Sequence, residues 1–294
     1  MKIVIAENMD GEVVAEISRL GEVVYRPHDL NLALASADVL VVRSATKVTA
    51  ELLKNAPKLR IVARGGVGLD TIDTKECERR KITVVNTPGA SSNAVAELAL
   101  GLMFSLARQL ARADSLMRQK TWAKKELAGS ELAGKTLGII GFGRIGSLVG
   151  KKAHALGMKI IYYNEVEAKA DYEARSDTLE NVLRQSDFVT LHVPSTPSTK
   201  GMLNAQRLAL MKAGAYLINT ARGDIMDEEA LYAALKGGKL AGAALDVYST
   251  EPYSGKLLEL QNVVFTPHIG AGTKEAQLRI GGELVKKLKE LLAK

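Results

Sequence analysis

Three residues that could act together chemically, Arg222, Glu251 and His268, each follow an apolar, β-branched run in the second half of the chain. If those runs are parallel strands of one sheet, their carboxyl ends meet at the edge where open α/β sheets bind ligands. Arginine can hold a carboxylate bidentately and polarise an adjacent oxygen. Histidine can take or give a proton, and a carboxylate beside it orients the ring and favours its charged form. Together they predict a site that oxidises a 2-hydroxy acid.

Each of these residues also has a simpler interpretation when it is considered alone. Glu251 could be a surface acid, and His268 could be a structural histidine. The other histidines have no comparable setting, and we interpret His28, His154 and His192 as structural. The prediction of a site therefore depends on the combination of residues.

A glycine motif stands between the strand-like run Thr136–Ile140 and a helix-like segment. In this setting Gly141 permits a tight turn, Gly143 lets a pyrophosphate approach the backbone, and Gly146 lets helix and strand pack closely. The helix N-terminus attracts the anion, and Arg144 can add a charge-assisted contact. The segment predicts a dinucleotide site.

The next apolar run, Lys159–Tyr163, ends at Asn164, where an acidic residue normally binds the ribose hydroxyls. Asn164 can still bond a ribose but repels a 2′-phosphate less than an acid would. Glu165 lies next to it, and no lysine or arginine precedes Lys169. A 2′-phosphate would lack a cationic partner, so we expect NAD rather than NADP.

The elements that would position these residues alternate between short apolar runs and helical stretches along the whole chain. Near-continuous Val, Ile and Leu runs are typical of strands covered on both faces, and hence of parallel sheets. The alternation predicts a doubly wound α/β fold. The predicted strands are Lys2–Ala6, Glu22–Tyr25, Val39–Arg43, Arg60–Ala63, Thr83–Asn86, Thr136–Ile140, Lys159–Tyr163, Phe188–His192, Ala215–Asn219, Gly242–Asp246 and Val263–Thr266.

One long helix is predicted to interrupt the alternation, from Asn93 to Arg118, and a last helix from Ala276 to Lys294. The first half of the long helix is apolar nearly all round, so it should be buried between domains or at a subunit interface. We expect a substrate domain of residues 1–93 plus 273–294, and a cofactor domain of residues 94–272. The length of 294 residues also suggests two domains.

Composition narrows the class of protein. With 47% hydrophobic and 25% charged residues, the chain is neither disordered, collagenous nor a coiled coil. A single cysteine excludes an intramolecular disulfide and a cysteine-rich zinc site, and we expect no metal. The net charge of +7 is dispersed, which favours small anions over nucleic acid. No targeting segment is apparent, and the longest charge-free apolar run, 98–107, is shorter than the ~18 residues of a membrane helix, so we expect a cytoplasmic protein without a membrane partner.

Taken together, these motifs resemble the D-isomer-specific 2-hydroxyacid dehydrogenases over nearly the whole chain. The motifs that carry the resemblance are Gly-Phe-Gly-Arg-Ile-Gly at 141–146, Asn-Thr-Ala-Arg-Gly at 219–223, Asp-Glu-Glu-Ala-Leu at 227–231, Ala-Leu-Asp-Val at 244–247 with Glu251-Pro252, and Pro-His-Ile-Gly at 267–270. The resemblance implies two doubly wound domains, a flavodoxin-like substrate domain and a Rossmann cofactor domain, with the active site between them. It also implies a homodimer with the long helix at its interface.

The resemblance also assigns roles to individual residues. Arg222, Glu251 and His268 match the catalytic Arg, Glu and His of the family, and Asp246 matches the residue that contacts the nicotinamide carboxamide. The other positions placed in the cofactor site are Ile145, Val193, Thr220, Ala221, Gly270 and Ala271, together with His268 and the glycine motif.

Two segments of the first domain bear on the substrate. Arg43 and Arg64 lie at the ends of neighbouring predicted strands, so with Arg222 they offer three positive charges where a 2-hydroxy acid needs one. The surplus suggests a second anionic group such as a phosphate, and the backbone N–H groups of Gly65 and Gly66 could bind a carboxylate. The alternative is that both arginines pair with acids and hold loops.

Both segments look like the substrate loops of D-3-phosphoglycerate dehydrogenases, which places Ser44 and Val67 beside the substrate as well. This implies oxidation of 3-phospho-D-glycerate to 3-phosphooxypyruvate, the first step of serine synthesis. Two alternatives stay open: a glyoxylate or hydroxypyruvate reductase, and a binding module of the dehydrogenase fold like the co-repressors of this superfamily. The sequence ends directly after the last predicted helix, so we expect no regulatory domain that senses serine.

Overall fold

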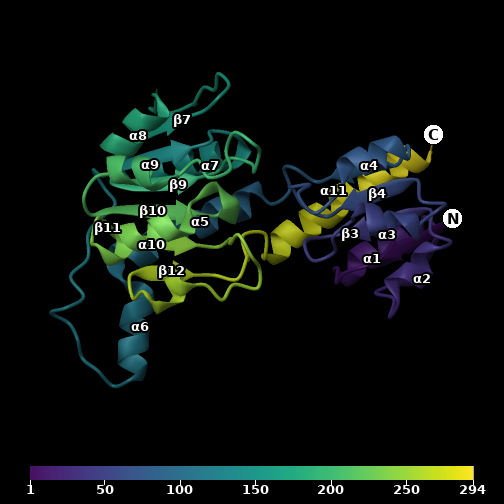
Figure 1. The fold of residues 1–294 in the computed structure, drawn as a ribbon, viewed down its shortest axis with the longest axis horizontal. Helices are drawn as coiled ribbons and strands as arrows, with labels where there is room; N and C mark the ends of the chain where they lie inside the picture. The colour runs from purple at the N-terminus through teal and green to yellow at the C-terminus, as the bar shows by residue number, and fades with distance from the viewer. Residues whose placement is uncertain (294) are drawn as a thin grey trace. The chain divides into compact units, whose positions relative to one another are not determined.

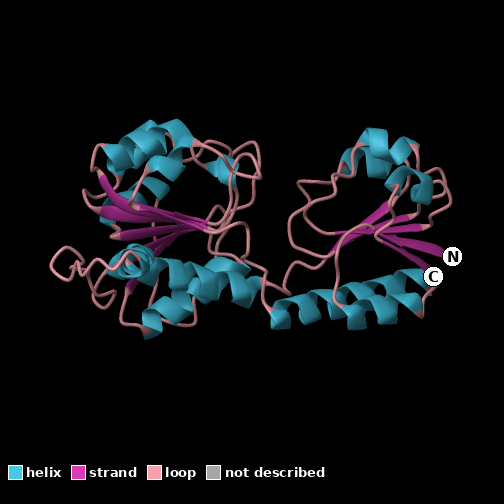
Figure 2. Cartoon of the chain, turned by 90° about the horizontal axis from the view of Figure 1, so that it is seen from below, coloured by secondary structure: helices cyan, strands magenta, loops and turns pink. Residues whose placement is uncertain are grey.

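Two parallel sheets, one of five strands and one of seven, form the framework of the computed structural model, which describes residues 1–293 (Figure 1). The first unit contains Met1–Ser92 and the chain from Ala271 onwards, and the second contains Asn93–Gly270. Helices cover both faces of each sheet (Figure 2). The predicted class, two doubly wound parallel α/β domains, is confirmed.

The five-stranded sheet has the order β2-β1-β3-β4-β5, which is the flavodoxin-like order. Ile3 and Ile5 face α1 and α11, whereas Val4 between them faces the opposite helices, because side chains alternate along a strand. The elements of this unit are β1 (Lys2–Ile5), α1 (Gly11–Ser18), β2 (Glu22–Tyr25), α2 (Leu30–Leu34), β3 (Val39–Val42), α3 (Ala50–Lys54), β4 (Ile61–Arg64), α4 (Thr74–Arg79), β5 (Thr83–Asn86) and α11 (Lys274–Leu292).

The seven-stranded sheet has the order β12-β11-β10-β9-β6-β7-β8, so the strand order reverses between β6 and β9. Such a switch point is where doubly wound sheets bind dinucleotides. The elements are α5 (Ser92–Arg108), α6 (Leu110–Arg118), β6 (Thr136–Ile140), α7 (Arg144–Ala155), β7 (Lys159–Tyr163), β8 (Arg175–Ser176), α8 (Leu179–Gln185), β9 (Phe188–Leu191), α9 (Ala205–Leu210), β10 (Ala215–Asn219), α10 (Glu228–Lys236), β11 (Leu240–Leu245) and β12 (Val263–Phe265), with short 3₁₀ helices at Gly223–Ile225 and Lys256–Glu259.

The prediction of one helix over Asn93–Arg118 is wrong. The helix breaks at Gln109, which adopts the left-handed conformation with φ 51°, and α5 and α6 meet at a bend of 63°. The chain after α6 returns to this point: Ser130 N–H donates to the carbonyl of Ala107 at 2.9 Å, and a Cβ on Gly129 would lie 2.4 Å from that oxygen. The segment Gly129–Ser130 thus hydrogen-bonds to a carbonyl at the end of α5. Helical periodicity in the sequence cannot predict such a long-range contact.

The remaining differences from the predicted elements are small. β8 was not predicted because its two residues are exposed and carry no apolar signal. The last helix begins at Lys274, two residues before the expected start, and its predicted end at Lys294 lies outside the described residues. Over residues 1–293 no single helix is both long and apolar enough to cross a membrane, and α5 and α6 reach that threshold only when counted together across their bend.

The packing of α11 on α1 leads to a stability prediction with an internal control. A Cβ on the buried Gly281 would lie 2.0 Å from Cγ2 of Val13, whereas a Cβ on the next residue, Gly282, would meet nothing within 4 Å. Gly281→Ala should therefore destabilise the protein by about 1–3 kcal/mol through overpacking. Gly282→Ala should stabilise it by about 1 kcal/mol, because alanine favours a helix over glycine. Chemical unfolding of both variants tests this, and equal effects would contradict the close approach of the two helices.

Candidate active site

The turn between β6 and α7 has the geometry that the glycine motif predicts. Gly141 has φ +95°, and a Cβ on it would lie 2.7 Å from the backbone of His192 and 2.8 Å from Cγ1 of Val193. A Cβ on Gly146 would lie 2.0 Å from the carbonyl oxygen of Gly141, so helix and turn pack as closely as their backbones allow. Only glycine fits at these two positions.

Gly143 differs from its neighbours because it faces open space. Nothing lies within 4 Å of where its Cβ would be, and it precedes the exposed Arg144 at the start of α7. The free N–H groups of the first helical turn and the helix dipole favour an anion there. Ile145, also placed in the cofactor site by the sequence, lies half-buried in the same turn.

Two buried polar atoms near this turn fit a bound dinucleotide. Nδ1 of His192, just after β9, and Oγ1 of Thr220, just after the neighbouring β10, are buried and bind no other atom of residues 1–293. Burial lowers the pKa of His192 to about 3, so its ring is neutral at neutral pH, with Nε2 2.9 Å from Oγ1 of Thr190. Buried polar groups are rarely left unsatisfied, so a ligand is a reasonable partner for these atoms.

Asn164, predicted to bind the ribose, makes two contacts within the protein. Its Oδ1 accepts the N–H of Phe142 at 2.8 Å, and its Nδ2 donates to the carbonyl of Val166 at 2.8 Å. The side chain therefore holds the tip of the glycine turn, a role that the sequence analysis did not include. The ribose contact stays a prediction.

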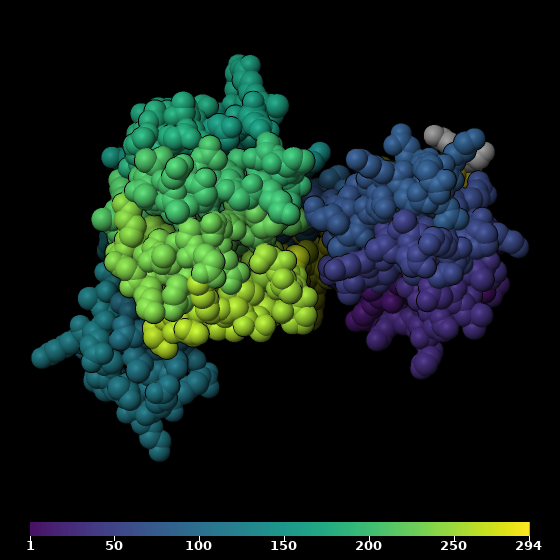
Figure 3. Space-filling view, in the orientation of Figure 1, coloured from purple at the N-terminus to yellow at the C-terminus, as the bar shows by residue number. Residues whose placement is uncertain are grey.

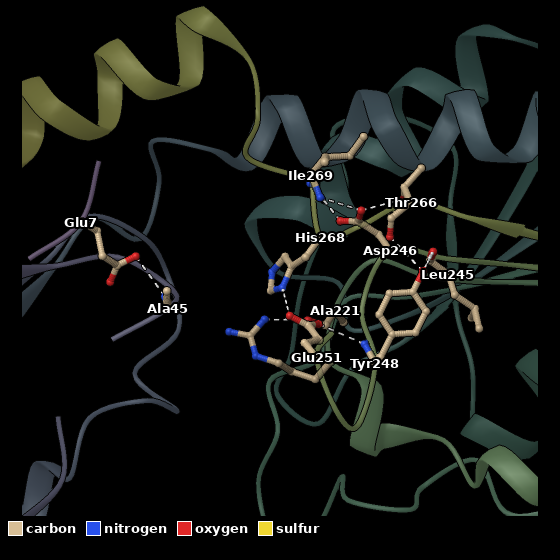
Figure 4. A network of polar contacts seen from close by, with 12 residues as sticks. Glu7, Ala45, Ala221, Leu245, Asp246, Tyr248, Glu251, Thr266, His268 and Ile269 are labelled. Atoms are coloured by element: carbon tan, nitrogen blue, oxygen red, sulfur yellow. Dashed lines mark hydrogen bonds and ion pairs between the residues drawn. The ribbon is translucent and has the colours of Figure 1, made fainter. Parts of the chain in front are cut away.

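His268 and Glu251 point toward one another, with Nδ1 of the histidine 2.8 Å from Oε2 of the glutamate (Figure 4). Both side chains are partly exposed, at 41% and 39%. The second carboxylate oxygen, Oε1, accepts the backbone N–H of Tyr248 at 3.2 Å. Because Glu251 occupies Nδ1, the other ring nitrogen of His268 is the one that can exchange a proton with a ligand.

The turn that carries His268 is held by the buried carboxylate of Asp246. Oδ1 of Asp246 accepts the hydroxyl of Thr266 at 2.6 Å and the N–H of Ile269 at 2.8 Å, and Oδ2 accepts the N–H of Gly270 at 2.9 Å (Figure 4). His268 itself has φ +53°, an uncommon backbone conformation for a residue with a side chain. These bonds fix that conformation, which is typical of a functional site. The contact of Asp246 with a nicotinamide stays a prediction.

Tyr248 also holds the segments around Asp246 and His268. Its hydroxyl lies 2.9 Å from the carbonyl oxygens of both Leu245 and Thr266, and its ring stacks on Tyr253 with centroids 4.5 Å apart. Burial raises the pKa of Tyr248 to about 12, so the hydroxyl keeps its proton and can donate. Neither tyrosine was predicted from the sequence, since aromatic residues beyond a strand end carry no specific signal.

Arg222 lies in a turn that touches the Glu251 loop directly. A Cβ on Gly223 would lie 1.9 Å from the backbone carbon of Tyr248, so the two loops cross backbone against backbone. Nη1 of Arg222 donates to the carbonyl of the buried Ala221 at 2.6 Å, and Asn219 donates to the carbonyl of Arg222. The second unit therefore brings the loops of Arg222, Glu251 and His268 together at the carboxyl edge of its sheet.

In the first unit, Arg43 follows β3 and is half-buried, while the next residue, Ser44, is exposed. Nη1 of Arg43 donates to the carbonyl of Asn8 at 2.9 Å. The carboxylate of Glu7 accepts the backbone N–H groups of Arg43, Ala45 and Thr46; Figure 4 shows the bond from Ala45. Glu7 was not predicted as a functional residue, although it directly follows the apolar run Lys2–Ala6, a signal that was used elsewhere.

The position of Arg64 differs from that of Arg43. The strand β4 extends through Arg64, whose side chain therefore lies on a covered face of the sheet and is only 8% exposed. Its Nη1 donates to Oγ1 of Thr71 at 3.3 Å, and a Cβ on Gly66 would lie 3.5 Å from its Nε. Arg64 thus lies against the glycine turn and bonds to Thr71, which agrees with the loop-holding part of the alternative interpretation, while its pairing with an acid stays a prediction.

The glycine turn beyond β4 is shaped by contacts inside the first unit. A Cβ on Gly65 would lie 3.3 Å from Ile280 on α11 and 3.6 Å from Cγ of Arg43. Val67 is 37% exposed, and its carbonyl accepts the side-chain amide of Asn86 at 2.6 Å. Ala271, named in the sequence as a cofactor residue, is assigned to this unit, and its carbonyl accepts Nε2 of Gln277.

The parallel seven-stranded sheet, the glycine turn at its switch point and the paired imidazole and carboxylate define a dehydrogenase of the dinucleotide-binding type. The NAD-binding-domain model of the D-isomer-specific 2-hydroxyacid dehydrogenases matches residues 100–270. A hydroxypyruvate reductase of Thermotoga maritima is 50% identical over 268 residues, which cover 90% of this chain and 88% of that protein.

Two further proteins extend the comparison. A D-3-phosphoglycerate dehydrogenase of Methanocaldococcus jannaschii is 42% identical over 301 residues, which cover 99% of this chain and 57% of that protein. The solved structure of a D-lactate dehydrogenase of Aquifex aeolicus, complexed with NAD and lactic acid, superposes with a TM-score of 0.90 at 32% identity, over 100% of this chain and 96% of that one.

The chain belongs to the D-isomer-specific 2-hydroxyacid dehydrogenase family. It is an NAD-dependent enzyme, as the glycine motif and the missing cationic partner for a 2′-phosphate predicted.

The pairing of His268 with Glu251 generates a prediction for activity. His268→Gln keeps the size of the side chain but removes the proton-transferring group, so we expect kcat to fall by about 10²- to 10⁴-fold. The dissociation constant of NADH, measured by fluorescence, should stay within about twofold, because the glycine turn is untouched. The exposed His28→Gln is the matched control and should leave both values unchanged. A His268→Gln variant with wild-type kcat would remove the histidine from the mechanism.

Proposed function

We propose that this enzyme oxidises 3-phospho-D-glycerate to 3-phosphooxypyruvate, the first step of serine synthesis. The observation that carries the proposal is Arg43, a half-buried cation at the carboxyl end of β3 in the first unit, whereas Arg222 belongs to the second unit. A simple 2-hydroxy acid has one carboxylate to bind. A second cation-bearing loop fits a substrate with a second anionic group.

In this proposal the residues of the second unit carry the chemistry. Arg222 holds the substrate carboxylate and polarises the oxygen on C2. His268 takes the proton of the C2 hydroxyl as that oxygen becomes a carbonyl, and Glu251 orients the ring and stabilises the imidazolium that forms. Bound NAD⁺ supplies the acceptor for the hydride that leaves C2. The glycine turn, Thr220 and Asn164 would hold it.

The residues of the first unit would bind the phosphate. We assign its direct contacts to Arg43 and the exposed hydroxyl of Ser44, with backbone N–H groups of Gly65 and Gly66. Arg64 contributes positive charge from beneath the glycine turn and keeps that turn in place. Val67 lines the same turn.

A second candidate function is the reduction of hydroxypyruvate or glyoxylate. The relative from Thermotoga maritima supports it, because it matches nearly end to end and is a hydroxypyruvate reductase. That reaction uses the same Arg222, Glu251 and His268 but gives Arg43 no phosphate to bind. Substrate preference therefore separates the two candidates.

The deciding experiment compares NADH-dependent reduction of phosphohydroxypyruvate, hydroxypyruvate and glyoxylate. We expect the highest kcat/KM for the phosphorylated compound. Arg43→Ala should raise its KM by about 10- to 100-fold and change the KM for hydroxypyruvate little, because only the phosphate loses a charge-assisted partner. The exposed Arg60→Ala, before the amino end of β4, is the matched control and should behave as wild type. Higher kcat/KM for hydroxypyruvate would favour the second candidate.

We also propose that the enzyme is a cytoplasmic homodimer. The buried free thiol of Cys77 suits a reducing compartment. The projecting segment of the second unit that includes α6 (Figure 3) carries three exposed apolar side chains: Leu110 at 52%, Met117 at 53% and Trp122 at 78%. Exposed apolar side chains gathered in one segment are typical of a protein interface.

Solution mass tests the proposed dimer. Light scattering should give twice the chain mass of 31.6 kDa, and Met117→Glu should shift the protein toward the monomer, because it places a charge in an apolar contact. Val166→Glu, at a residue 71% exposed in a loop of the same unit, should leave the dimer intact. A monomeric wild type would refute the proposal.

A further inference from the structure

Glu7 makes an unusual number of contacts to one short stretch of backbone. Its Oε1 accepts the N–H of Arg43 at 2.8 Å and of Thr46 at 2.9 Å, and its Oε2 accepts the N–H of Ala45 at 3.0 Å. Three backbone donors within four residues converge on one carboxylate. Such converging N–H groups make an anion-binding concavity, and here a side chain of the protein fills it.

The carboxylate of Glu7 is ionised in this setting. Burial by itself raises the pKa of Glu7, but the N–H groups of Ala45, Thr46 and Arg43 and the hydroxyl of Thr46 outweigh burial and hold the pKa below its usual value. A negative charge so close to the proposed phosphate-binding residues repels the substrate. The carboxylate of Glu7 must therefore favour substrate binding in another way that outweighs this repulsion.

The turn around Glu7 also fixes the side chain of Arg43. The carbonyl of Asn8 accepts Nη1 of Arg43 at 2.9 Å, and Oδ1 of Asn8 accepts the hydroxyl of Tyr25 at 2.8 Å. The N–H of Met9 donates to the same tyrosine oxygen at 3.3 Å. One turn after β1 thus determines both the backbone path of residues 43–46 and the direction of the Arg43 guanidinium.

We propose that Glu7 is a positioning residue for substrate binding: it holds the segment Arg43–Thr46 in the one conformation that presents Arg43 and Ser44 to the anionic end of the substrate. The inference rests on the proposed function, since it takes Arg43 and Ser44 as substrate contacts. Glu7 itself does not touch the substrate. Glu7 favours binding because the loop is already ordered in the free enzyme, so no binding free energy is lost in ordering it.

Substitution of Glu7 distinguishes positioning from simple electrostatics, because the two predict opposite signs. In Glu7→Gln the amide nitrogen faces a backbone N–H, so at least one bond is lost and the loop loosens. Positioning predicts that KM for the phosphorylated substrate rises by about tenfold at nearly unchanged kcat. If the charge of Glu7 mattered only by repelling the substrate, its removal would lower KM.

A second variant keeps the charge and alters only the geometry. Glu7→Asp is shorter by one methylene and cannot reach all three donors, so positioning predicts a KM rise here too, whereas an electrostatic role predicts no change. Hydrogen exchange of residues 43–46 should become faster in both variants, which reports the loop directly. A nearly unchanged kcat shows that each variant is folded, and unchanged NADH affinity shows that the second unit, which contains the glycine turn, is unaffected.

The matched control is Glu22→Gln, the same substitution on an exposed glutamate at the amino end of β2. It should match wild type in KM and in exchange. If the wild type prefers phosphohydroxypyruvate and Glu7→Gln leaves KM unchanged or lowers it, the inference is overturned while the proposed function stands. If the wild type prefers an unphosphorylated 2-oxo acid, the proposed substrate fails and the inference fails with it, because Arg43 then has no phosphate to bind.

Discussion

Parallel strands impose one constraint on this molecule: every strand of a sheet releases the chain at the same edge, so loops that are distant in sequence crowd together there. Loops at such an edge cannot rely on a strand partner to hold them. The structure meets this need with the same interaction several times. Glu7, Asn164 and Asp246 each lie within two residues of the end of a strand and accept backbone N–H groups from a loop that carries a candidate functional residue.

At Asp246, a buried side chain holds the loop of an exposed candidate catalytic residue. Asp246 is 1% exposed and binds the backbone around His268, while His268 itself stays accessible. The side chain that fixes the turn is thus buried, and the side chain proposed to exchange a proton with the substrate is exposed. The loops of Gly223 and Tyr248 cross with no space for a side chain between them. Their close backbone contact also fixes the geometry of the loops.

The sequence predicted the sheets and the strands well because buried parallel strands have a strong local signature. Ten of the short apolar runs match observed strands within one residue at their ends, and the run Gly242–Asp246 matches β11, which begins two residues earlier at Leu240. It did not predict the break at Gln109 or the burial of Arg64. The break depends on contacts with a segment about twenty residues further along the chain. The burial of Arg64 depends on β4 continuing one residue beyond the predicted end of the strand at Ala63. Local patterns name the residues at a sheet edge, but they do not say which of them hold loops and which meet a ligand. Asn164 and Asp246 show this, because both were named and both proved to be bonded within the protein.

The close contact between the Gly223 and Tyr248 loops limits which parts of the protein can change in sequence. The loops of the second unit interlock through backbone contact, so a change in one of them disturbs its neighbour, and this part of the molecule tolerates little variation. In the first unit, exposed Ser44 and Val67 stand on loops whose shape is set by other residues, Glu7 and Arg64. In the proposed substrate site, exchange of these two exposed residues would change selectivity while the loops that hold them and the second unit stay as they are, which makes the first unit the place to redesign selectivity.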